Sequence, residues 1–105
     1  EVLAAQAAAG AVHGSEALRR YVVRILEVTR ADPRVDLGAS PRAGLMLFRA
    51  AKAKAALEGR DHALPDDVQA LANSVLAHRL LLAPGSGVQE REAVVRDAVD
   101  RVTAL

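Results

Sequence analysis

Hydrophobic residues recur at helical spacing in five stretches of the chain, and breaks rich in glycine and proline separate these stretches. Between the breaks, apolar residues repeat every three to four positions, and no stretch alternates apolar with polar residues as a half-buried strand does. The pattern predicts five helices and no sheet of consequence, with the helices over residues 2–9, 16–30, 41–58, 65–82 and 88–102.

Four of these helices have an apolar face that predicts a shared core. The expected buried residues are Leu18, Tyr21, Val22, Ile25 and Leu26, then Ala43, Met46, Leu47, Ala50, Ala53 and Leu57, then Val68, Leu71, Val75 and Leu76, and finally Val94, Val95, Ala98, Val99 and Val102. Short connections favour antiparallel neighbours. We therefore expect an all-α fold, a compact bundle of four to five helices, with residues 1–105 forming one helical domain.

Start and stop signals support the predicted helix limits. Ser15 and Ser40 are suitable N-caps, Pro41 occupies the first position of the helix after Ser40, and Gly59 follows the end of that helix. Pro65 is followed by two acidic residues, Asp66 and Asp67, and we interpret these as stabilising the exposed N–H groups of the first turn. Residues 33–38 are expected to form a loop.

Composition excludes several classes of function. The chain of 105 residues has a net charge of +1, 2% aromatic residues and no cysteine, which argues against a nucleic-acid binder, a disulfide framework and a thiolate zinc site. Uninterrupted apolar runs such as residues 80–83 are far shorter than a membrane span. No basic segment precedes an apolar one at residues 1–10, as a secretory signal would require. We expect a cytoplasmic protein without nucleic-acid or membrane partners.

The residues of an enzyme active site are missing from the sequence. His13, His62 and His78 are scattered rather than spaced to share a helix face, so no metal site is predicted. No serine lies in a nucleophile elbow, and the Gly-x-x-x-x-Gly-Lys-Ser/Thr pattern of a P-loop does not occur. We therefore expect that this chain alone is not an enzyme.

The segment 37–43 is the one candidate site. Ser40 and Pro41 fix a helix start, and Arg42 then projects from a first turn whose unpaired N–H groups and dipole attract anions. A guanidinium there can donate two parallel hydrogen bonds to a phosphate. The alternative is an ordinary solvated arginine near a helix end, and the residues alone leave both interpretations open.

The stretch Gly38-Ala39-Ser40-Pro41-Arg42-Ala43 resembles the sensor-2 motif of the MoxR family of AAA+ ATPases, in their C-terminal lid. Leu64 departs from the family, which usually has a capping Ser or Thr there, and we expect a less tightly fixed helix start. The similarity is dense over residues 11–83, and further matching segments are Val12–Glu16, Tyr21–Val23, Arg49–Asp61, Pro65–Val68 and Val75–Leu80.

The resemblance implies a lid fragment whose P-loop nucleotide-binding domain is absent. It implies that Ser40, Pro41 and Arg42 contact the nucleotide and that Arg42 acts catalytically as the sensor-2 residue at the γ-phosphate. ATP and Mg²⁺ would bind the parent chain and not the fragment alone. The implied partners are the chain's own P-loop domain, neighbouring subunits of a homo-oligomeric ring and von Willebrand-type proteins. Two alternatives are the lid of a magnesium-chelatase ATPase subunit and a free-standing helical interaction module.

The absence of a P-loop domain from this chain also predicts an exposed apolar surface. Surface that such a domain covers would be open in the isolated chain, and large apolar patches are unusual on monomers. We expect exposed apolar residues beside Arg42, namely Ala39, Pro41 and Leu45, and on parts of the N-terminal helix.

Overall fold

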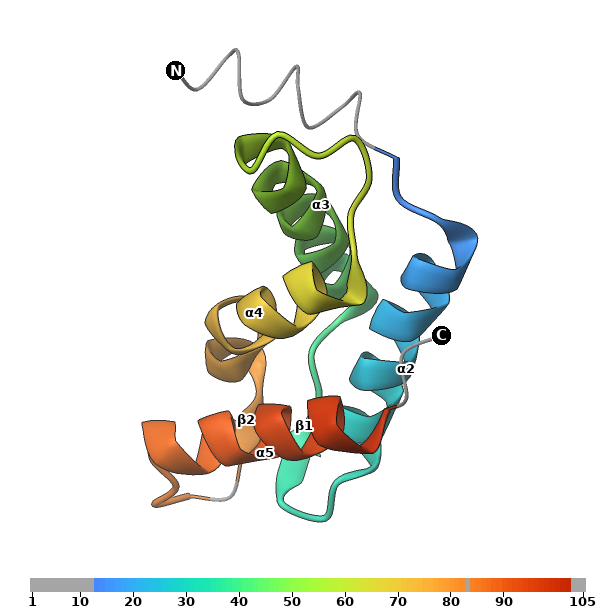
Figure 1. Cartoon of the computed structure of the whole chain (residues 1–105). Coiled ribbons are helices and arrows are strands. Elements are labelled where there is room, and N and C mark those ends of the chain that lie inside the picture. Colours follow the sequence, from blue (N-terminus) through green and yellow to red (C-terminus); the bar gives the residue numbers. More distant parts are fainter. Residues whose placement is uncertain (1–12, 83, 103–105) are drawn as a thin grey trace.

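A computed structural model of the chain describes residues 13–82 and 84–102 (Figure 1). The helix predicted over residues 2–9 lies outside the described residues. The elements in chain order are α2 (Glu16–Ala31), β1 (Val35–Leu37), α3 (Pro41–Leu57), α4 (Pro65–Leu76), the 3₁₀ turn η1 (Ala77–Arg79), β2 (Leu81–Leu82) and α5 (Val88–Arg101).

The helices enclose one apolar core. α3 packs against α4 and α2, while α5 crosses the lower end of the molecule and contacts α2 and α4 (Figure 1). Every α-helix of the described part supplies fully buried side chains, among them Ile25 from α2, Leu47 from α3, Val68 from α4 and Val94 from α5. The prediction of an all-α bundle is confirmed.

The predicted helix starts are confirmed at two serines. Ser15 Oγ accepts a hydrogen bond from the Leu18 N–H at 3.0 Å, and Ser40 Oγ accepts one from the Ala43 N–H at 3.4 Å. At the other end of α3, Gly59 has a φ of +77°, the left-handed conformation in which a side chain would be strained. Both ends of α3 are therefore set by local sequence.

Two short strands were not predicted. β1 lies within the expected loop 33–38, and it pairs antiparallel with β2, with Val35 opposite Leu82 and Leu37 opposite Leu81. The prediction that a helix extends from 65 to 82 was wrong, because α4 ends at Leu76. Leu80 and Leu82 are both buried. An extended chain places residues two positions apart on one side, whereas a helix would place them on opposite sides.

The buried face of α3 was predicted only in part. Ala43 and Leu47 are buried as expected, but Met46 and Leu57 are exposed, and Ala50 and Ala53 are half-buried. The buried face instead includes Gly44, Phe48, Ala51 and Ala55. Alanine occurs all around this helix, so its hydrophobic pattern leaves the orientation poorly determined.

Candidate functional site

The candidate phosphate-binding segment leaves the core at Ala39 and begins α3 at Pro41. Ala39 is buried, whereas Ser40, Pro41 and Arg42 are exposed, and Arg42 lies in the first turn of the helix as the sequence predicted. Among the described residues, no carboxylate forms an ion pair with Arg42. The guanidinium therefore stands beside the positive end of the α3 dipole without a described counter-ion.

Close packing against α2 holds this segment in place. A Cβ atom added to Gly38 would lie 2.2 Å from Cγ of Arg30, and one added to Gly44 would lie 2.4 Å from Cδ1 of Leu26. Neither position has room for a side chain unless the neighbour moves. The two glycines thus let the start of α3 approach the second half of α2 closely.

We predict that Gly44→Val destabilises the protein. The larger side chain must displace Leu26, which is itself buried, and overpacking of this kind costs about 1–3 kcal/mol of unfolding free energy. Chemical denaturation measures the difference. Arg49→Val, at an exposed position of the same helix, should stay within about 0.5 kcal/mol. Equal stability of Gly44→Val and the unmodified chain would contradict the close approach.

A groove of about 250 Å³ lies between α2 and α3, next to Arg42. Apolar side chains form most of its lining, and arginines of α2 complete it. The lining residues are Arg19, Val22, Val23, Leu26, Arg30, Pro41, Gly44, Leu45 and Phe48. The guanidinium of Arg19 lies 4.8 Å from the centre of the Phe48 ring, a cation–π contact.

Exposed apolar residues surround the start of α3. Leu45 and Met46 follow Arg42 by three and four positions, which places them on its side of the helix, and each is 41% exposed. Leu37 and Leu81, opposite each other in the small sheet, are 65% and 55% exposed. The expectation of exposed apolar residues is confirmed for Pro41 and Leu45. It is wrong for Ala39, which packs into the core.

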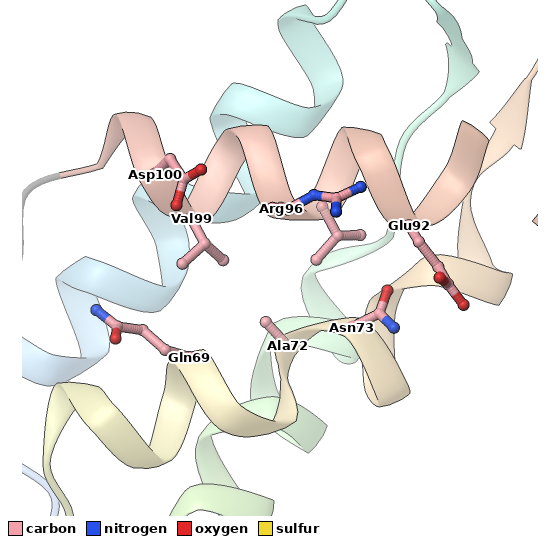
Figure 2. Close-up of a pocket in the computed structure, with 8 residues that line it drawn as sticks. Gln69, Ala72, Asn73, Glu92, Arg96, Val99 and Asp100 are labelled. Atoms are coloured by element: carbon pink, nitrogen blue, oxygen red, sulfur yellow. The ribbon is translucent and has the colours of Figure 1, made fainter. Parts of the chain in front are cut away.

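A second cavity, of about 270 Å³, is lined by residues of α4 and α5 (Figure 2). Gln69 and Asn73 reach into it from α4, and Glu92, Arg96 and Asp100 reach into it from α5. The Gln69 amide also donates a hydrogen bond to the Tyr21 hydroxyl at 3.1 Å. This cavity carries charges of both signs and shares no lining residue with the groove beside Arg42.

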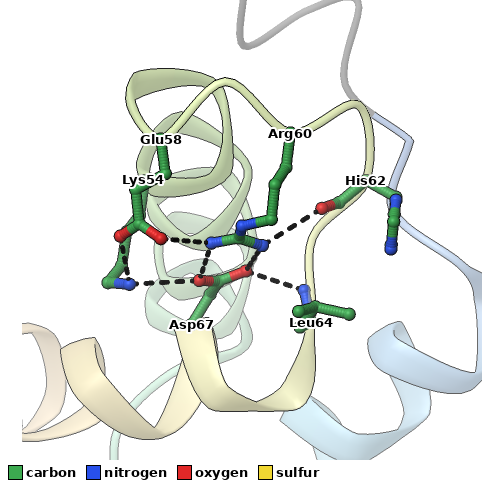
Figure 3. A network of polar contacts seen from close by, with 6 residues as sticks. All are labelled: Lys54, Glu58, Arg60, His62, Leu64 and Asp67. Carbon is green, nitrogen blue, oxygen red and sulfur yellow. Dashed lines mark hydrogen bonds and ion pairs between the residues drawn. The ribbon is translucent and has the colours of Figure 1, made fainter.

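A buried carboxylate joins the end of α3 to the start of α4 (Figure 3). Asp67 is 1% exposed, and both of its oxygens accept hydrogen bonds from the Arg60 guanidinium, at 2.6 and 2.8 Å. Lys54 Nζ lies 3.2 Å from the same carboxylate, and the Leu64 N–H donates to it at 2.7 Å. Glu58 accepts from both cations at the exposed edge of the cluster.

This cluster changes the expected roles of Leu64 and Asp67. No side chain caps α4 at Leu64, as the sequence predicted, but the Asp67 carboxylate accepts a hydrogen bond from the Leu64 N–H and so holds the start of α4 from within its first turn. Asp67 also does more than stabilise an exposed helix end, since it is buried and ion-paired, whereas the neighbouring Asp66 is exposed as expected. In the sequence, Arg60 and Asp67 lie seven positions apart on either side of a loop. That spacing alone does not show that their side chains are in contact.

The cluster predicts acid sensitivity. The Arg60 guanidinium holds the pKa of Asp67 well below its ordinary value of 3.8, and the Leu64 N–H and Lys54 act in the same direction against the opposing effect of burial. A lowered folded-state pKa contributes stability that is present above the unfolded value and is lost as the pH falls below it. The free-energy difference between the unmodified chain and Asp67→Asn should therefore shrink below about pH 4. A constant difference from pH 7 to pH 2.5 would contradict this.

The described part of the chain offers neither a cluster of metal ligands nor a helix that could cross a membrane. Residues 13–82 and 84–102 hold no group of three or more His, Asp or Glu side chains that could bind a metal ion. Within the same residues, no helix combines the length and apolarity that crossing a bilayer requires.

The chain is similar to known proteins in sequence and in fold. Residues 27–98 match the family model of the AAA lid domain. Over 94 residues the chain is 42% identical to the uncharacterized protein YeaC of Bacillus subtilis, covering 87% of this chain and 29% of that protein. Over 105 residues it is 40% identical to protein MoxR of Paracoccus denitrificans, covering 88% of this chain and 31% of that protein.

The chain is also similar to a chaperone and to a solved structure. Chaperone MoxR1 of Mycobacterium tuberculosis is 40% identical over 75 residues, covering 63% of this chain and 20% of that protein. The crystal structure of a proposed ATPase from Cytophaga hutchinsonii superposes with a TM-score of 0.82 at 26% identity, covering 94% of this chain and 33% of that one.

The chain belongs to the AAA lid domain family. More narrowly, it is a lid of the kind found in MoxR-like AAA+ ATPases, as the resemblance predicted. Two of these three relatives carry the name MoxR, and none of the three is named a magnesium chelatase. The chain spans about a third of the length of the first two relatives.

Proposed function

We propose that this chain is the C-terminal lid of a MoxR-type AAA+ ATPase and that residues 1–105 act as one lid domain beside a P-loop domain. The observation that carries the proposal is Arg42, exposed in the first turn of α3 and free of carboxylate partners among the described residues, in a chain similar to MoxR proteins. ATP hydrolysis belongs to the whole protein, and the lid contributes contacts to the nucleotide.

In this proposal, the Arg42 guanidinium binds the γ-phosphate. Ser40 and Pro41 fix the start of α3 rigidly, so the Arg42 guanidinium extends from the positive end of the helix dipole, where an anion is favoured. This arrangement fits a phosphate oxygen. It does not fit Mg²⁺, because the described residues offer no cluster of metal ligands. ATP and Mg²⁺ are therefore held by the P-loop domain, whose motif this sequence lacks.

Loss of the γ-phosphate then couples chemistry to movement. While ATP is bound, the contact with Arg42 favours the closed arrangement of lid and P-loop domain, and hydrolysis removes that preference. Exposed apolar residues around the start of α3 that lie outside the α2–α3 groove, among them Leu37 and Met46, supply the surface that the P-loop domain covers. In a ring of identical subunits this movement drives chaperone-like remodelling, with von Willebrand-type proteins as partners.

Measuring the ATP turnover of the chain alone and of the longer protein tests whether hydrolysis requires the P-loop domain. The 105-residue chain should hydrolyse no ATP, because its sequence lacks the P-loop motif that holds the β-phosphate, whereas the protein that joins it to a P-loop domain should hydrolyse ATP. Turnover by the purified chain that a point change within it abolishes would contradict the proposal.

A further inference from the structure

The groove between α2 and α3 contains two arginines that take no part in the proposed contact between Arg42 and the nucleotide. Arg19 and Arg30 both line it from α2, and they lie 11 positions apart. Eleven residues make slightly more than three helical turns, so the two arginines share one face of α2 at a separation of about 16 Å along its axis. Between them, Val23 from α2 and Leu45 from α3 form an apolar stretch, exposed by 45% and 41%.

Both arginines are positioned by packing rather than by ion pairs. The Arg19 guanidinium lies over the Phe48 ring, and the stem of Arg30 lies against Gly38. Among the described residues, neither arginine forms an ion pair, and no acidic residue lines the groove. Elsewhere in the fold, Arg34 and Arg60 each bind two carboxylates. The groove thus keeps two cations at its ends with their donors available.

We propose that the α2–α3 groove binds an acidic amphipathic helix of a partner protein. Two carboxylates of that helix, 11 positions apart, pair with Arg19 and Arg30, and apolar side chains between them contact Val23 and Leu45. An amphipathic helix carries such residues on one face at matching spacing. The apolar floor and the near-neutral net charge of the chain disfavour a nucleic acid, whose binding depends on a larger excess of positive charge.

The test uses a designed peptide as the probe. A helical peptide of about 18 residues carries two glutamates 11 positions apart with two leucines between them on the same face, and a reference peptide of equal composition carries the glutamates on the opposite face. Titration of each into the 105-residue chain should show at least about tenfold tighter binding of the first peptide, since two placed ion pairs distinguish the two.

Variants of α2 locate the binding. Arg30→Glu and Arg19→Glu should each weaken binding of the matched peptide at least about tenfold, whereas Arg24→Glu, on another side of the same helix, should change it by less than about twofold. A peptide with lysines in place of the glutamates should bind Arg19→Glu better than it binds the unmodified chain. Circular dichroism verifies that each variant folds, and Arg19→Glu replaces Arg30→Glu if the latter does not.

Three results would overturn the proposal. Equal binding of the matched and reference peptides would mean that the chain attracts acidic peptides in general, without specific pairing of the two glutamates with Arg19 and Arg30. A loss for Arg24→Glu as large as that for Arg19→Glu would mean that general positive charge is responsible. Equal binding of a peptide whose leucines are replaced by serine would mean an anion site, with no role for Val23 and Leu45. Each result is independent of ATP turnover, which tests the nucleotide proposal separately.

Discussion

Arg42→Ala should lower ATP turnover of the longer protein, in which this lid accompanies a P-loop domain, by at least about tenfold. A charge-assisted hydrogen bond contributes roughly 1.5–3 kcal/mol, and one decade in rate corresponds to about 1.4 kcal/mol. The contact is proposed to form with the γ-phosphate, whose charge distribution changes in the reaction, so its loss acts on turnover at saturating ATP. Steady-state turnover of purified protein measures the effect.

Two further variants distinguish the geometry of the contact from its charge. Arg42→Lys should recover only part of the lost turnover, because lysine keeps the charge but lacks the planar fork that donates two parallel hydrogen bonds. Arg24→Ala, which removes an exposed arginine from α2, should leave turnover unchanged. The stability of Arg42→Ala should differ by less than about 0.5 kcal/mol, since Arg42 is exposed. Normal turnover in Arg42→Ala would assign Arg42 to the solvated surface.

Asp67→Ala should lower the unfolding free energy by about 3 kcal/mol, because removing one member of a buried ion pair leaves its partners without the charge that balanced them. It also removes the acceptor for the Leu64 N–H at the start of α4. For a domain of this size the melting temperature should fall by roughly 10–20 °C. Calorimetry or thermal circular dichroism measures it.

The neighbouring Asp66 provides the matched control. It lies in the same helical turn and carries the same charge, but it is exposed and forms no described ion pair. Asp66→Ala should cost no more than about 0.5–1 kcal/mol, the scale of a helix-dipole interaction at the surface. If the two alanine variants melt at the same temperature, the Arg60–Asp67 pair does not hold α3 to α4 in the way the structure indicates.

Local signals determined most of what the sequence predicted correctly about the fold. The apolar face of α2 was predicted completely because five large side chains recur at helical spacing, and the N-caps Ser15 and Ser40 marked their helices without tertiary information. The orientation of α3 was not predictable to the same degree, since its contacts depend on Gly44 and Phe48 meeting α2. Pairing of β1 with β2 is a contact between segments far apart in the chain, and short apolar runs do not distinguish strand from helix.

For the candidate site too, local sequence signals were informative, whereas contacts between distant segments could not be predicted. Arg42 could be placed from sequence because its position follows from an adjacent helix start. The groove beside it and the Arg60–Asp67 pair both require elements to meet in space, and neither has a local pattern that indicates it. Arg19 and Arg30 have no local pattern that indicates a binding site, and only the packing of α3 against α2 shows that they line a groove.

Nucleotide affinities test most directly whether Arg42 recognises the γ-phosphate. Dissociation constants of ATP and ADP should be measured for the longer protein with and without Arg42→Ala. The part of this contact that already forms with bound ATP should be lost as ATP affinity, whereas ADP, which lacks the contacted group, should bind with nearly the same affinity. Equal weakening of ATP and ADP, or no change in either, would contradict the assignment of Arg42 to the γ-phosphate.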